Sequence, residues 1–201
     1  MRLRARPARD VDLIRLCLDV NVWIGHYLTA ARRPHAPDAV SGLARAVFAG
    51  SCRCGPVQLI VSHAMLDTLE AVMKRLPELA AMAEVARDQV EAAAGSGSLA
   101  EPPAIILGGS AAYPLLDQED AGVLNTAMAQ QAALLVTSNL ADLIRGPKAR
   151  TDTEVLSRAR DVPDVVRLSH PKLPGGLVIA TPFRAAGWLL RGEPPPAGTH
   201  L

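Results

Sequence analysis

Acidic and amide side chains follow two short apolar runs that lie far apart in this sequence. Asp19 and Asn21 come directly after the run 14–18, and Asn139 comes after the run 134–137. Carboxylate oxygens are ligands that divalent cations take in proteins. A bound cation can activate water and stabilise the charge that develops on a phosphodiester. These residues therefore indicate metal-assisted hydrolysis, provided that the fold brings them together.

Two further aspartates could complete such a site. Asp142 lies one helical turn after Asn139, and Asp120 lies near the start of a predicted helix that Asp117 opens. Clustered carboxylates repel one another unless a cation lies between them. Each residue also has a purely structural interpretation, because Asp19 could cap a helix and acids in a first turn favour the helix dipole. The order and spacing of the three segments favour the metal site.

Short apolar runs alternate with amphipathic helical patterns along most of the chain. Strands are predicted at 14–18, 57–61, 105–107, 134–137, 165–168 and 177–180. Helices are predicted at 21–31, 40–48, 63–76, 78–94, 118–128, 140–145 and 182–190, and a loop is predicted at 51–56. This alternation favours an α/β fold with a parallel sheet, whose sites form outside the carboxyl ends of the strands. We expect one domain over 13–191, with a basic arm over 1–12 and a flexible tail over 192–201.

The composition argues against several classes of protein. Of 201 residues, 49% are hydrophobic and 20% are charged, which is typical of a globular chain and not of a disordered one. The net charge of +1 gives no bulk attraction to nucleic acid or membranes, and 3% aromatic residues argue against a base-stacking platform of the single-strand binders. No run approaches the ~18 apolar residues of a membrane span. Cys17, Cys52 and Cys54 predict free thiols and a cytoplasmic protein.

Three segments of the chain resemble the PIN-domain family, specifically the branch typified by VapC-type toxin ribonucleases. They are LCLDVNVWI at 16–24, LIVSHAMLDTLEAVMKR at 59–75, and LLDQEDAGVLNTAMAQQAALLVTSNLADL at 115–143. The resemblance implies a three-layer α/β/α fold with a central, mainly parallel sheet. It also implies an acidic pocket that binds Mg²⁺ or Mn²⁺ and hydrolysis of single-stranded RNA.

The resemblance also implies roles for individual residues. Asp19, Asp120 and Asp142 match the family's acids and would hold the metal, with Asn139 as the polar companion of Asp142. The supporting polar positions of the family are matched by Asn21 and Thr137.

One position departs from the family pattern. Thr68 stands where the family usually has a glutamate on its second helix. At roughly 100° per residue, neither Glu70 nor Asp67 points in the same direction as Thr68. We therefore expect one carboxylate fewer at the site, unless Asp117 or Glu119 compensates from the opposite wall.

The leading hypothesis is a metal-dependent endoribonuclease, the toxin half of a toxin–antitoxin pair, with RNA as substrate and an antitoxin as partner. A homodimer is expected from the resemblance alone, and no membrane association is expected. The alternative is a degenerate PIN domain that binds RNA or a protein with weak or no catalysis, which the threonine at position 68 motivates. A third possibility, a phosphatase-like domain with Asp19 as phosphate acceptor, is disfavoured because the segment lacks a second acid two residues later.

Overall fold

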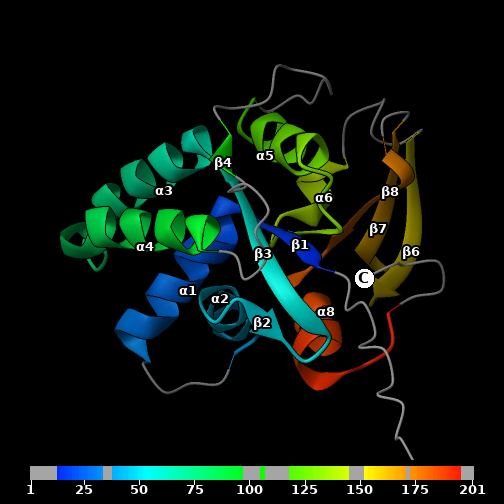
Figure 1. The fold of residues 1–201 in the computed structure, drawn as a ribbon, viewed down its shortest axis with the longest axis horizontal. Helices are drawn as coiled ribbons and strands as arrows, with labels where there is room; N and C mark the ends of the chain where they lie inside the picture. Colours follow the sequence, from blue (N-terminus) through cyan, green and yellow to red (C-terminus); the bar gives the residue numbers. More distant parts are fainter. Residues whose placement is uncertain are drawn as a thin grey trace, which may run out of the picture.

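A largely parallel sheet forms the centre of the computed structural model, which describes residues 13–33, 38–96, 105–106, 118–144, 152–170 and 173–195 (Figure 1). Its order is β2-β3-β1-β5-β8-β7-β6, and β4 pairs with β3. The strands are β1 Ile14–Leu18, β2 Ser51–Cys52, β3 Gly55–Ser62, β4 Ile105–Ile106, β5 Leu134–Val136, β6 Thr153–Ala159, β7 Val162–His170 and β8 Leu173–Ala180. The four strands β3, β1, β5 and β8 run parallel, as the sequence predicts.

Helices flank the sheet, with α5 on one face and α2 and α8 on the other (Figure 1). The α-helices are α1 Val20–Arg32, α2 Ala39–Phe48, α3 His63–Arg75, α4 Ala83–Gly95, α5 Gln118–Ala129, α6 Leu140–Leu143 and α8 Pro182–Ala186. A 3₁₀ turn, η1, covers Ala80–Met82, and a π-helical turn, η2, covers Gly187–Arg191. The three-layer α/β/α fold expected from the sequence is confirmed.

Local sequence explains where the helices begin. The Asp38 carboxylate accepts a 2.8 Å hydrogen bond from the Ser41 amide, and the Ser62 hydroxyl accepts a 3.3 Å bond from the Met65 amide. Both are N-caps of the type that polar residues provide after a loop or strand. Asp19 stands at the same position before α1 but makes no side-chain capping hydrogen bond. Its carboxylate is therefore directed to other partners.

Three elements differ from those predicted. The segment expected as a loop at 51–56 contains β2, which forms a hairpin with β3. The helix expected to start at residue 78 starts at Ala83, because the fully buried Leu79 is followed by the turn η1. Strand β6 was not predicted, since its exposed and partly buried residues give no regular apolar alternation.

The register of the sheet aligns the ends of β1, β5 and β8 with the first residues of the antiparallel β7 in one row. Leu18 pairs with Val136, and Val136 pairs with Ala180, which pairs with Val165 of the antiparallel β7. One residue further, backbone hydrogen bonds join Asp19 N to Val136 O, Thr137 N to Ala180 O, and Thr181 N to Asp164 O, at 2.9, 3.1 and 3.0 Å. We call Asp19, Thr137, Thr181 and Asp164 the strand-end row. It marks the edge at which parallel sheets form their sites.

No helix among the described residues is long and apolar enough to cross a membrane. The three cysteines are unbridged, as predicted.

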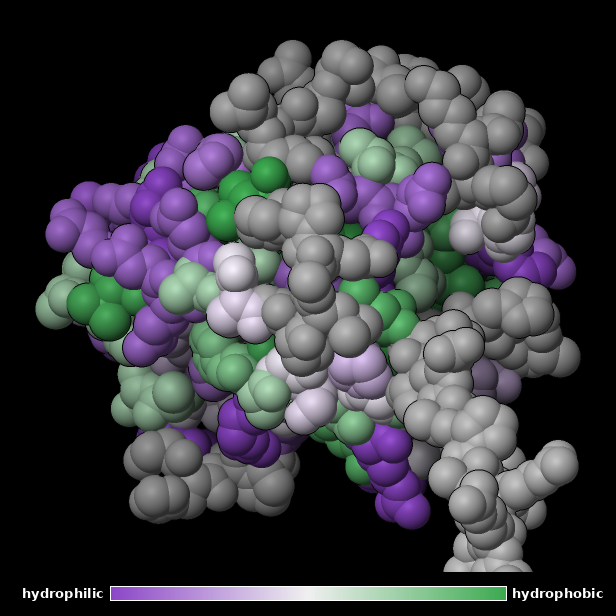
Figure 2. All heavy atoms as spheres, viewed as in Figure 1, coloured by the Kyte–Doolittle hydropathy of each residue, from purple (hydrophilic) through white to green (hydrophobic). Residues whose placement is uncertain are grey.

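The face seen in Figure 2 is hydrophilic over α3 and α4. Charged side chains of these two helices pair there, with Lys74 Nζ 2.6 Å from Glu70 Oε1 and Arg87 Nε 3.4 Å from Glu70 Oε2.

Candidate active site

Asp19 is the centre of a small hydrogen-bonded cluster at the carboxyl end of β1. Its Oδ2 atom accepts two hydrogen bonds of 2.6 Å, one from Thr137 Oγ1 and one from Asn21 Nδ2. The Asn21 amide also donates to Thr137 Oγ1 over 3.1 Å. These three residues, the Asp19–Asn21–Thr137 cluster, fix the direction of the carboxylate by contacts between two neighbouring strand ends.

Backbone contacts tie the same cluster to the start of α6. Asn21 Oδ1 accepts a 3.0 Å hydrogen bond from the amide of Ser138, and Thr137 Oγ1 accepts a 3.0 Å bond from the amide of Asn139. Asn139 is thus joined to the cluster through its main chain, while its side chain makes no capping bond to α6. The resemblance implied that Asn139 is the polar companion of Asp142, and the contact that the structure describes for it is this main-chain bond.

Asp19 is only 5% exposed, and its surroundings set its protonation. Burial raises the pKa of the Asp19 carboxyl above its ordinary value of 3.8. The hydrogen bonds from Thr137 and Asn21, together with the amides of Val20 and Asn21, oppose this effect by favouring the ionised form. Among the described residues no basic side chain pairs with Asp19, so within that part of the chain no positive charge balances its carboxylate.

A small pocket opens beside this cluster, with a volume of about 80 Å³. Its wall is formed by the beginnings of α1 and α3 and by the first half of α5, namely Val20, Ser62, Ala64, Met65, Thr68, Gly122 and Val123. The first of these residues follows Asp19 directly in the chain. Thr68, the residue that stands at the family's glutamate position, is thus in the wall of a pocket that Val20 also lines.

The acids on either side of Thr68 point elsewhere. Glu70 is held by Lys74 and Arg87 in the charged surface of α3 and α4. The side chain of Asp67 is 71% exposed and lies 3.7 Å from Arg87. Neither carboxylate is available to take the place of a glutamate at position 68, which agrees with the helical-wheel argument.

Asp120 and Asp142 lie on elements that border the same edge. Asp120 is one helical turn before Val123 on α5, hence on the side of that helix that faces the pocket. Asp142 lies in the first turn of α6, which begins directly after the cluster. Both residues are partly buried. Within the described ranges, no group of three or more His, Cys, Asp or Glu side chains is close enough to hold a metal ion.

The chemistry of the described donors fits a divalent cation in part. A buried carboxylate without a positive partner is a strong oxygen ligand, and Mg²⁺ commonly takes one or two protein carboxylates and completes its shell with water and substrate phosphate. Asp19 would supply the first of these, and Asp120 and Asp142, on α5 and α6, are the acids that the family resemblance offers for another. Asp117, which was predicted to support the site, lies outside the described residues.

The comparison with protein families is decisive for the fold of the chain. The model of the PIN domain matches residues 15–141, which is more than half of the sequence. The chain belongs to the PIN-domain family. PIN domains are generally nucleases and typically use divalent metal ions. Comparisons with curated proteins and with solved structures give no match.

The matched part of the PIN domain contains Asp19, Thr68, Asp120 and Thr137 but ends before β6. Thr181 and Asp164, which complete the strand-end row, lie beyond it. Sequence reasoning missed both of these, together with the contribution of Ser62 to the pocket. The sequence does carry one signal, because Thr181 follows the apolar run 177–180 as Thr137 follows 134–136.

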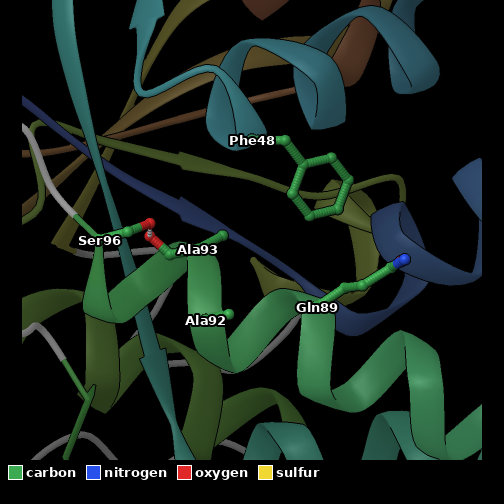
Figure 3. Close-up of a pocket in the computed structure, with 5 residues that line it drawn as sticks. All are labelled: Phe48, Gln89, Ala92, Ala93 and Ser96. Atoms are coloured by element: carbon green, nitrogen blue, oxygen red, sulfur yellow. Dashed lines mark hydrogen bonds between the residues drawn. The ribbon is translucent and has the colours of Figure 1, made fainter.

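A larger hollow of the PIN domain, of about 410 Å³, lies between the end of α2 and α4 (Figure 3). Phe48 faces this hollow from α2, and Gln89, Ala92, Ala93 and Ser96 line it from the side of α4. None of these five side chains titrates, and none is a carboxylate. The hollow therefore offers no acid–base group for hydrolysis, and the small pocket near Asp19 is the better candidate for the active site.

Proposed function

We propose that this PIN domain is a metal-dependent endoribonuclease that hydrolyses single-stranded RNA. The observation that supports this most directly is Asp19: a buried carboxylate at a parallel strand end, oriented by Asn21 and Thr137 and lacking a basic partner in the described chain. A folded protein seldom keeps a buried, unpaired carboxylate unless a cation binds it or a reaction requires it.

The proposed roles follow from the positions of the side chains. Asp19, with Asp120 and Asp142, would hold Mg²⁺ or Mn²⁺, which supplies an activated water and stabilises charge on the phosphodiester. Thr137 and Asn21 favour the ionised form of the Asp19 carboxylate and fix its direction by donating hydrogen bonds to its Oδ2 atom. The pocket lined by Thr68 and by Val20, the neighbour of Asp19 in the chain, would receive part of the substrate.

A labelled single-stranded RNA tests this proposal. The purified full chain is incubated with Mg²⁺, with Mn²⁺, or with EDTA, and cleavage is followed by gel electrophoresis. We expect cleavage only with metal, and a loss of about 100-fold or more in Asp19→Asn, because changing even an outer partner of a metal ligand costs about 10–100-fold. Asp88→Asn is the matched control, since Asp88 is a 76% exposed acid on α4. Equal rates for wild type and Asp19→Asn would reject the enzyme.

A second candidate is a PIN domain that binds RNA or a protein with weak or no catalysis. Two observations favour it: Thr68 removes one expected carboxylate, and the described residues hold no group of three metal ligands. Isothermal titration with Mn²⁺ separates the two candidates. No binding of Mn²⁺ by the wild type, together with RNA binding in EDTA, would favour the non-catalytic function.

We also propose that the enzyme acts in the cytoplasm as the toxin of a toxin–antitoxin pair. The basis is the resemblance of segments 16–24, 59–75 and 115–143 to the VapC-type branch. Induced expression should arrest growth, whereas the Asp19→Asn variant should not. A short gene for a DNA-binding antitoxin beside this one, whose product relieves the arrest, would complete the assignment. Light scattering would test the expected homodimer.

A further inference from the structure

Phe183 is the most exposed large apolar side chain that the structure describes, at 63%. It lies in the first turn of α8, two residues after Thr181. Thr181 belongs to the strand-end row, two strands away from Asp19 through Thr137. Since neighbouring strands are about 4.8 Å apart, Thr181 is about 10 Å from Asp19 along the edge of the sheet. Phe183 therefore lies at the same edge of the sheet as Asp19, within reach of a single-stranded RNA bound along that edge.

The ring of Phe183 has one covered face. The guanidinium carbon of Arg191 is 5.0 Å from the ring centroid, in a cation–π arrangement. Arg191 is itself fixed, because its Nε donates to Glu193 Oε1 over 2.8 Å and its Nη2 donates to the Phe183 carbonyl over 3.4 Å. The ring is thus supported from one side. An exposed, supported aromatic ring is a suitable surface for stacking a base.

The next residue, Arg184, is held by a buried acid. Its Nε donates to Oδ2 of Asp164, whose side chain is 7% exposed, while the Arg184 side chain is 34% exposed. Asp164 is the last member of the strand-end row, so this ion pair anchors the arginine at the same edge as Asp19. Within the described residues the two terminal nitrogens of Arg184 make no hydrogen bond. An arginine oriented in this way presents a planar fork that matches the oxygens of a phosphate.

We infer that Phe183 and Arg184 form a nucleotide-binding subsite for single-stranded RNA, in which a base stacks on the phenyl ring and a backbone phosphate binds the guanidinium. This inference rests on the proposed function, because it places the subsite at the same edge of the sheet as Asp19. One ring does not make an extended stacking platform, which the low aromatic content argues against. It contacts a single base near the bond that is cleaved, and Asp164 acts as a positioning residue for the arginine.

Binding of a fluorescein-labelled U₁₂ RNA, measured by fluorescence anisotropy in EDTA, tests the stacking contact. Phe183→Ala should weaken binding by about 5- to 100-fold, and Phe183→Trp should retain it, because stacking accepts any aromatic face. Phe48→Ala is the matched control, since Phe48 is the chain's other phenylalanine, is 40% exposed and lies on α2. Equal affinities for Phe183→Ala and Phe48→Ala would overturn the inference.

The salt dependence of the same binding tests the phosphate contact. Arg184→Gln should reduce the slope of log K against log salt by about 0.7, the value for one phosphate of a single strand, and Arg184→Lys should preserve most of it. Arg45→Gln, at an exposed arginine of α2, should leave the slope unchanged. Because Arg184→Gln leaves Asp164 without its partner, the double variant Asp164→Asn/Arg184→Gln is measured beside it, and it should show the same smaller slope. An unchanged slope in both would reject the phosphate contact.

The outcomes separate this inference from the proposed enzyme. If the wild type cleaves RNA but Phe183→Ala binds U₁₂ as tightly as the wild type does, only the subsite is rejected. If the wild type never cleaves but its U₁₂ affinity depends on Phe183, the nuclease is rejected and the subsite stands. If Phe183→Ala changes the oligomeric mass in light scattering and leaves U₁₂ binding unchanged, the ring belongs to a protein contact and the inference is wrong.

Discussion

The Thr137 hydroxyl donates a 2.6 Å hydrogen bond to Oδ2 of Asp19, across 118 residues of sequence. The two residues follow adjacent parallel strands, and the same hydroxyl accepts hydrogen bonds from the Asn21 side chain and the Asn139 amide. The buried side chain of Thr137 thus joins the segment that follows β1 to the segment that follows β5. The contribution of this hydroxyl to the site can be measured directly.

Thr137→Val should impair both stability and activity. The substitution keeps the shape of the side chain and removes the hydroxyl, so the Asp19 carboxylate loses a donor and two N–H groups lose an acceptor. We expect a loss of about 1–3 kcal/mol in the free energy of unfolding, from chemical denaturation. The acid limb of the pH–rate profile should also move to higher pH, because a lost hydrogen bond to the ionised form raises the pKa of Asp19.

Thr126→Val is the control for this substitution. Thr126 is also fully buried, but its hydroxyl donates to the Gly122 carbonyl of its own helix and not to Asp19. It should leave the pH–rate profile in place. Acid limbs that coincide for the two variants would contradict the role assigned to Thr137.

The stability of the metal-free protein should fall as Asp19 ionises. Because burial raises the pKa of Asp19 in the folded state, the folded protein retains this proton at a pH where the unfolded chain has lost it. The stability that this retained proton gives the folded state is present at low pH. It is lost as the pH rises from about 3.8 through the pKa of Asp19 in the folded protein. A divalent cation should reverse the loss.

Thermal melting between about pH 4 and 8 measures this effect, with 1 kcal/mol corresponding to about 2–4 °C in a chain of this size. In EDTA, Asp19→Asn should melt at a higher temperature than the wild type at neutral pH. Mn²⁺ should raise the melting temperature of the wild type and leave that of the variant unchanged. A wild type that is equally stable in EDTA and in Mn²⁺ would contradict a cation at Asp19.

Thr68→Glu should strengthen metal binding. The side chain lies in the wall of the pocket of about 80 Å³ beside Val20, so a carboxylate there would approach the region of Asp19. We expect Mn²⁺ affinity to rise by about 10-fold, since each added anionic ligand strengthens the binding of a hard cation. Titration calorimetry measures the affinity, and a cleavage assay shows whether the rate follows.

Thr68→Gln is the control for Thr68→Glu, and both are compared with the wild type. Thr68→Gln adds nearly the same volume without the charge, and Leu69 and the rest of the buried face of α3 remain unchanged. Its Mn²⁺ affinity should equal that of the wild type. Without metal, Thr68→Glu should be the least stable of the three proteins, because its new charge repels Asp19. Equal Mn²⁺ affinity in the glutamate and glutamine variants would show that position 68 does not face the metal.

Gly176→Ala should destabilise the sheet more than Gly175→Ala. Both glycines adopt positive φ angles, +75° and +98°, at which an L side chain costs about 1–2 kcal/mol. At Gly176 an added Cβ would also lie 2.7 Å from the Leu168 carbonyl oxygen, whereas nothing lies within 4 Å at Gly175. We expect a loss of about 3 kcal/mol at Gly176 and about 1 kcal/mol at Gly175 by urea denaturation. Similar losses at both sites would contradict the close β7–β8 contact.

Short-range patterns in the sequence were sufficient for much of this fold. The strand 14–18 was predicted because its apolar residues lie within a few positions of one another, and the caps of α2 and α3 also depend on residues only three positions apart. The capping alternative for Asp19 could be weighed but not decided from sequence. It required the contact with Thr137, whose partner is more than a hundred residues away.

The parts that could not be predicted depend on pairing between distant segments. Strand β6 is an exposed edge strand with an irregular register, so it carries no apolar period of its own. Thr181 and Asp164 look like ordinary polar residues until the register aligns them with Asp19. The interest of Thr68 came from the family pattern alone, because no periodicity within α3 distinguishes a threonine beside a site from one on the surface.

The alignment of Asp19 with Thr137 also bears on which mutations such a gene can accumulate. Side chains alternate between the two faces of a strand, so losing or gaining one codon within 14–18 or 134–136 would turn one of these two residues to the opposite face. Substitutions among the apolar residues of these runs preserve the alternation. Natural variants of this chain should therefore differ in the identities of the apolar residues in these two short runs while conserving the number of residues in each run.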